Sequence, residues 1–108
     1  MNSAVLENER IEAMAHEMGD TLVQRASRMD TNQKAKEWVM VKTANETAAD
    51  NWLALARYFV VKKQYAQARG TYQRILDTYS DQPFQAYAER AKKGLRDLDL
   101  ILDPSADP

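Results

Sequence analysis

Apolar residues recur at spacings of three and four along most of this chain, and this recurrence constrains the fold more than any other feature. Such spacing lines up side chains on one face of an α-helix. Only three Gly and three Pro occur in 108 residues, which also favours long helices. The sequence therefore predicts an all-α fold of about five helices, in a single domain that spans residues 1–108.

The first helix is predicted from Ser3 to about Arg28. The pair Gly19-Asp20 interrupts it, so the helix either continues through the pair or restarts with Asp20 as N-cap. An unbroken apolar stripe favours one continuous helix. The stripe consists of Ile11, Met14, Ala15, Met18, Leu22, Ala26 and Met29.

The segment 30–46 is the most ambiguous part of the pattern. Asp30-Thr-Asn-Gln33 has the form of a capping box and predicts a second helix over about 32–44. Trp38–Val41 alone could form a strand. Because the chain offers no convincing partner strand, a helix is the better prediction.

Three further helices are predicted at about 48–63, 65–79 and 83–102. Thr47-Ala-Ala-Asp50 is a capping signal for the first of them, and Ser80–Pro83 separates the other two. The remaining residues, Asp103–Pro108, form a polar tail that is expected to fray.

A further pattern spans the predicted helices 48–63 and 65–79. Trp52 to Phe59 has the form Trp-x2-Leu-Ala-x2-Phe, and Ala68 to Tyr72 has the form Ala-x3-Tyr. The pattern resembles the tetratricopeptide (TPR) repeat, W-x2-L-G-x2-Y…A-x3-F…P, over about residues 47–83. The resemblance implies an antiparallel helical hairpin of the α-α superhelix type.

The same resemblance divides the chain into N-terminal helices (1–46) and a TPR-like repeat with a C-terminal capping helix (47–102). One repeat cannot bury its own apolar face, so the other helices are expected to cover it. The stretch Tyr72–Leu95 is also similar to repeats of bacterial cell-envelope scaffolds, such as the outer-membrane lipoprotein that assists β-barrel assembly. Ser80 stands where those repeats have Pro.

TPR folds bind proteins or peptides with the first helix of each repeat, so the resemblance implies a non-catalytic scaffold or adaptor. Arg57 would pair with an acidic group of the partner. An alternative is that the N-terminal helices bury Leu53 and Val60. The implied protein-binding residues are Asp50, Leu53, Arg57, Val60 and Val61.

Between Arg57 and Arg96 there are nine basic residues and three acidic ones. This excess could attract nucleic acid, and a helical regulator is one alternative function. A solvated helix surface is the simpler interpretation, because no aromatic–basic interleaving or known motif supports nucleic-acid binding. His16, the only histidine, has no catalytic or metal-binding pattern around it. The sequence predicts no enzyme, cofactor or metal site.

Self-association through the first helix is a further alternative, because Met14, Met18 and Met29 could form an adaptable homodimer contact. The chain has no Cys, which excludes disulfides. No segment approaches a membrane span, and the first ten residues lack the pattern of a signal peptide. A cytoplasmic location is the simplest expectation, although a mature envelope domain without its leader would have the same features.

Overall fold

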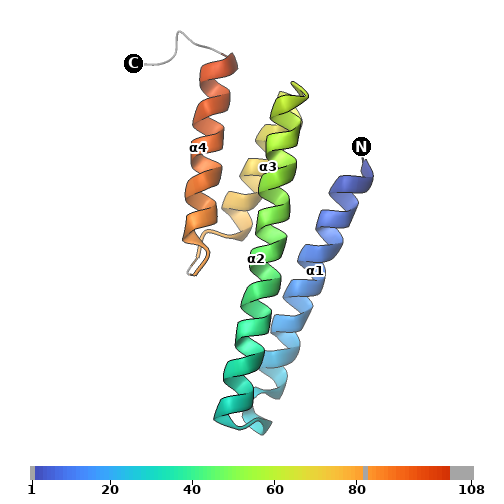
Figure 1. Ribbon diagram of the computed structural model, residues 1–108, viewed down its shortest axis with the longest axis vertical. Helices are drawn as coiled ribbons and strands as arrows, with labels where there is room; N and C mark the ends of the chain where they lie inside the picture. Colours follow the sequence, from blue (N-terminus) through green and yellow to red (C-terminus); the bar gives the residue numbers. More distant parts are fainter. Residues whose placement is uncertain (1, 82, 103–108) are drawn as a thin grey trace. The chain divides into compact units, whose positions relative to one another are not determined.

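The computed structural model describes residues 2–81 and 83–102, and these residues form helices without any strand (Figure 1). The described α-helices are α1 (Asn2–Arg25), α2 (Thr31–Val61), α3 (Tyr65–Thr78) and α4 (Gln85–Leu102). A 3₁₀ turn, Ala26–Arg28, follows α1. The all-α prediction is confirmed, but the described part has four α-helices rather than about five. The predicted frayed tail, 103–108, lies outside the described residues.

The chain divides into two compact units, Met1–Ala48 and Ala49–Pro108, and the boundary between them falls within α2. In the first unit, α1 continues through Gly19 as predicted. A β-carbon at position 19 would lie 3.5 Å from Cγ1 of Val41 on α2. Ala15 and Leu22 are buried, whereas Met14 and Met18 are exposed. The predicted apolar stripe of α1 is therefore split between a buried side and a surface side.

Helix α2 corrects the prediction of two separate helices over 32–44 and 48–63. Asp30 caps its start, because Gln33 N–H donates to Asp30 Oδ1 at 2.7 Å. Thr47 does not cap a new helix; its Oγ1 donates to the carbonyl of Thr43 at 3.0 Å. Asn45 Nδ2 likewise donates to the carbonyl of Val41 at 2.9 Å. Both side chains bond to the preceding turn, so the polar stretch continues the helix instead of breaking it.

The turn from α2 to α3 is a Schellman motif. Gln64 N–H donates to Phe59 O at 2.8 Å, and Lys63 N–H donates to Val60 O at 3.0 Å. Lys63 itself has φ 61°, in the left-handed region that favours glycine. This turn reverses the chain and starts α3 at Tyr65, the residue predicted.

Helix α4 begins at Gln85, two residues after the predicted start at Pro83. Phe84 N–H donates to Asp81 O at 2.8 Å, so the chain makes a turn before the helix starts. The ring of Tyr79 lies 6.0 Å from that of Phe84 and 6.5 Å from that of Tyr87. This aromatic cluster joins the end of α3 to the start of α4.

The core of the second unit contains large side chains from α2, α3 and α4. The guanidinium of Arg74 on α3 lies 4.4 Å from the ring centroid of Trp52 on α2. Burial of these side chains supplies most of the favourable free energy of folding. The largest fully buried side chains are Trp52, Phe59, Ile75, Tyr79 and Leu98.

Candidate protein-binding grooves

Three helices of the second unit surround a groove of about 270 Å³, which we call the Arg57 groove. Apolar side chains form most of its wall, and two charged residues lie on it. The lining residues are Arg57, Val60 and Val61 from α2, Tyr72 from α3, and Gly94, Asp97, Leu98 and Ile101 from α4.

Three of the five residues implied as a binding site by the sequence line this groove together: Arg57, Val60 and Val61. Val61 is 77% exposed and therefore accessible to a partner. Asp50 is exposed on α2 but does not line the groove. Leu53 is only 3% exposed, so its side chain belongs to the interior.

The contributions of α3 and α4 to the groove were not identified from the sequence. Tyr72 and Leu98 have the spacing of ordinary core residues, and nothing local distinguishes them. Gly94 was the available signal, because a glycine inside a helix costs about 1 kcal/mol against alanine and often marks a close approach.

The electrostatics of the groove depend on four neighbouring side chains. Burial raises the pKa of the Tyr72 phenol above its ordinary value, while the positive charge of Arg57 acts to lower it. The phenol therefore stays neutral at physiological pH and can donate a hydrogen bond. Asp97 accepts a hydrogen bond from Lys93 Nζ at 3.0 Å. Among the described residues, no carboxylate forms an ion pair with Arg57.

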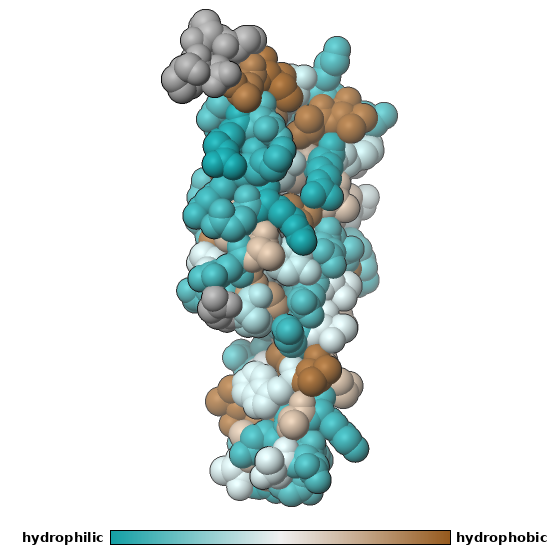
Figure 2. All heavy atoms as spheres, turned by 60° about the vertical axis from the view of Figure 1, so that its left-hand side comes forward, coloured by the Kyte–Doolittle hydropathy of each residue, from teal (hydrophilic) through white to brown (hydrophobic). Residues whose placement is uncertain are grey.

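Exposed hydrophobic side chains gather at the C-terminal end of α4 (brown in Figure 2), where Leu100, Ile101 and Leu102 are exposed. Ile101 also lines the Arg57 groove. The groove therefore opens beside an apolar surface, which extends the area that a partner could cover.

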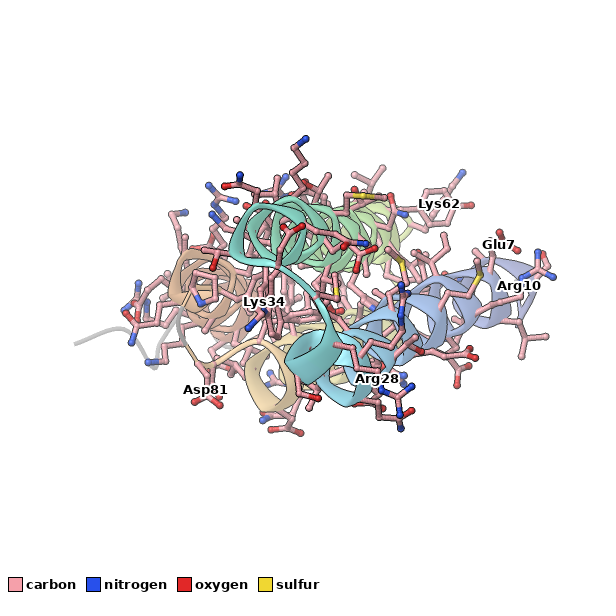
Figure 3. The ribbon with its side chains drawn as sticks, turned by 90° about the horizontal axis from the view of Figure 1, so that it is seen from below. Glu7, Arg10, Arg28, Lys34, Lys62 and Asp81 are labelled. Carbon is pink, nitrogen blue, oxygen red and sulfur yellow. The ribbon has the colours of Figure 1, made fainter. Side chains whose placement is uncertain are left out.

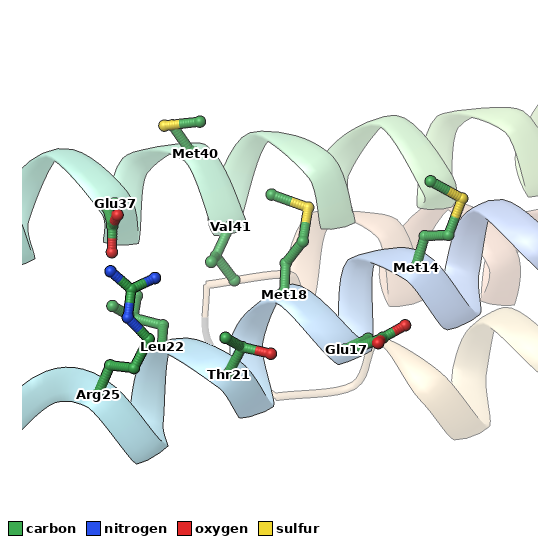
Figure 4. A pocket seen from close by; sticks show the side chains of 9 residues that line it. All are labelled: Met14, Glu17, Met18, Thr21, Leu22, Arg25, Glu37, Met40 and Val41. Carbon is green, nitrogen blue, oxygen red and sulfur yellow. The ribbon is translucent and has the colours of Figure 1, made fainter.

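The first unit contains a second groove, of about 350 Å³, between α1 and α2 (Figure 4). We call it the methionine groove. Arg25 and Glu37 point toward one another at one end of it. The apolar lining residues are Met14, Met18 and Leu22 from α1 and Met40 and Val41 from α2.

The structure also places the side chains that were considered for catalysis and metal binding. His16 is exposed on α1. The described residues contain no group of three or more His, Asp or Glu side chains that could hold a metal ion.

Within residues 2–81 and 83–102, no helix has both the length and the apolar character needed to cross a membrane. Comparison with protein-family models, with curated proteins and with solved structures finds no match to this chain.

Proposed function

We propose that this protein is a non-catalytic protein–protein interaction module, a scaffold or adaptor with a TPR-like hairpin, and that it binds an acidic, partly apolar peptide segment in the Arg57 groove. The observation that supports this most is the presence of Arg57, Val60 and Val61, all selected from the sequence, in one open groove.

The size and lining of the groove favour a peptide side chain over a cofactor. Pockets for small molecules typically hold roughly 300–1,000 Å³, and the Arg57 groove is smaller, at about 270 Å³. Val60, Leu98 and Ile101 would contact an apolar side chain. Removing such a side chain from water contributes about 1.5–3 kcal/mol when burial is complete.

The charges favour an acidic segment. Arg57 has no carboxylate partner among the described residues, whereas Asp97 is already bonded to Lys93. Nine basic and three acidic residues between Arg57 and Arg96 add a wider positive field. Arg57 would bind a partner carboxylate, and the field would raise the rate of encounter.

The TPR-like hairpin would consist of the Ala49–Val61 part of α2 together with α3. Its two small residues, Ala56 and Ala68, are both fully buried, as close helix packing requires. Helix α4 would close the hairpin as its capping helix. Its outer side has charged pairs such as Lys92–Glu89 at 3.4 Å, which suits a face turned to water.

The decisive experiment compares three forms of the protein as bait in native lysate: wild type, Arg57→Glu and Arg96→Glu. Both variants change the net charge equally, but Arg96 does not line the groove. We expect partner proteins, identified by mass spectrometry, to be captured by wild type and Arg96→Glu and lost with Arg57→Glu at unchanged helicity. Equal capture by all three forms would refute the Arg57 groove as the binding site.

A further inference from the structure

The methionine groove leaves large apolar side chains at the surface of the first unit. Met14 is 58% exposed and Met40 is 60% exposed, and both line the groove. Val41 and Leu22, which are buried, form its floor. Further helices can pack into a groove of this kind between two antiparallel helices, as they do in helix bundles. Methionine suits such a contact because its unbranched side chain adapts to the opposing surface.

Two charged residues of α1, one toward each end of the helix, indicate what covers the groove. Glu7 precedes Met14 by seven residues, and Arg25 follows Met18 by seven residues. Seven residues are close to two helical turns, so each charge lies on the same side of α1 as the neighbouring methionine. Glu7 is near the N-terminal end of α1, and positive side chains such as Arg28 and Lys34 lie near the connection to α2 (Figure 3).

A second copy of α1 that runs antiparallel to the first covers the exposed methionines and pairs the opposite charges in one register. If Met14 lies opposite Met18 of the second copy, Glu7 falls opposite Arg25, and two-fold symmetry repeats both contacts. A parallel arrangement would instead bring Glu7 beside Glu7 and Arg25 beside Arg25, which is unfavourable. The existing contacts of these charges do not prevent the new pairing. The Glu7–Arg10 pair, at 3.0 Å, is exposed and contributes little. Arg25, which points toward Glu37 of its own copy, is exposed as well, and its guanidinium has enough N–H donors to bind a second carboxylate.

We propose that the protein self-associates through the methionine groove, with α1 of one copy antiparallel to α1 of another and the two helix pairs forming a four-helix arrangement. This interface belongs to the first unit and does not involve the Arg57 groove, so either proposal can fail without the other.

The methionine contact of the proposed interface is tested with Met18→Glu and a matched control, Val23→Glu. Self-association of the whole chain is measured by sedimentation equilibrium over a range of concentrations. Val23 is also on α1 and is 63% exposed, but it does not line the groove. We expect a monomer–dimer equilibrium for the wild type and for Val23→Glu. Met18→Glu should raise the dissociation constant at least about ten-fold, since a buried charge at an interface is strongly unfavourable. A wild type that stays monomeric at all concentrations, or equal effects of the two variants, would overturn the proposal.

The antiparallel register is tested by charge reversal. Glu7→Lys alone places two positive charges opposite each other at both contacts, and Arg25→Glu alone places two negative charges there. Each variant should weaken association about five-fold. An equimolar mixture restores opposite charges at both contacts and should associate as tightly as the wild type. Circular dichroism checks that each variant keeps its helicity. If the mixture associates no better than its components, this register is wrong.

Discussion

The ring of Tyr72 on α3 lies directly against the backbone of Gly94 on α4. A β-carbon at position 94 would come within 2.7 Å of Cε2 of the ring, and closer still to Cε1 and Cζ. Helices α3 and α4 can approach at this point because position 94 has no side chain. Both residues line the Arg57 groove, so the same contact that packs the two helices also shapes the groove.

Replacing Gly94 by alanine should therefore destabilise the protein. Helix propensity alone predicts a gain of about 1 kcal/mol, but forcing a methyl group against a buried ring typically costs about 1–3 kcal/mol. The net expectation is a loss of up to about 2 kcal/mol in the free energy of unfolding, measured by urea denaturation.

Gly70 on α3 is the matched control, because a β-carbon there would have no atom within 4 Å. Gly70→Ala should increase the free energy of unfolding by about 1 kcal/mol. A gain of stability at both positions would show that Tyr72 does not restrict position 94.

The turn between α2 and α3 predicts a second pair of opposite effects. Lys63 has φ 61°, where a residue with a β-carbon is strained, so Lys63→Gly should stabilise by about 1 kcal/mol. Lys62 directly follows α2 and keeps a helix-type hydrogen bond, since its N–H donates to Tyr58 O at 3.0 Å, so Lys62→Gly should destabilise by about 0.5–1 kcal/mol. Both variants lose the same charge. Thermal unfolding would contradict this turn geometry if the two melting temperatures shifted in the same direction.

The continuity of α2 can be tested at its two capping sequences. Asp30 caps the start of the helix, so Asp30→Ala should cost about 1 kcal/mol. Thr47 lies inside the helix, where alanine is the better helix former, and Thr47→Ala should gain about 0.5 kcal/mol. Urea denaturation measures both effects. If Thr47→Ala lowers the free energy of unfolding as much as Asp30→Ala does, a separate helix begins at Thr47.

The contact between Arg74 and Trp52 predicts a stabilising role for a charged residue. The guanidinium lies 4.4 Å from the indole centroid, and Trp52 is buried, so the cation–π interaction is partly shielded from water. Arg74→Met keeps an unbranched side chain of similar bulk and should lower the free energy of unfolding by about 1–2 kcal/mol. Arg96→Met, at an exposed position on α4, should change it by less than about 0.5 kcal/mol. Equal effects at the two positions would exclude a specific role for the Trp52 contact.

The raised pKa of Tyr72 makes stability depend on pH in alkaline solution. The folded protein retains the phenol proton at pH values where the unfolded chain, with the ordinary pKa of 10.0, has lost it. The contribution of the protonated phenol is complete below pH 10 and declines as the pH rises through the folded pKa. As the pH rises above 10, the wild type should therefore lose stability relative to Tyr72→Phe. The check is the free energy of unfolding of both proteins, measured as a function of pH. If the difference between the two stays constant up to pH 11, the pKa of Tyr72 is not raised.

Local sequence patterns predicted the class of the fold and most helix boundaries. The spacing of apolar residues specified helices, because burial of one helical face depends only on a period near 3.6 residues. The start of α3 at Tyr65 and the cap at Asp30 were also predicted, since turn and capping bonds join residues within a few positions of each other. Arg57, Val60 and Val61 were selected because the TPR resemblance implies a binding face on the helix that contains them.

Tertiary structure decided what the local patterns left open. Thr47 and Asn45 can cap a new helix or bond back within an existing one, and their side chains do the latter in α2. The stripe on α1 did not specify that Ala15 would be buried and Met14 exposed, because both lie within the same apolar sector. The Arg57 groove joins residues from three successive helices, and only packing brings Tyr72 and Gly94 to its wall. The sequence alone determined the helical class and the α2 side of the groove, because both depend on residues close together in the chain. The continuity of α2 and the close approach of α3 and α4 were decided only in the folded structure.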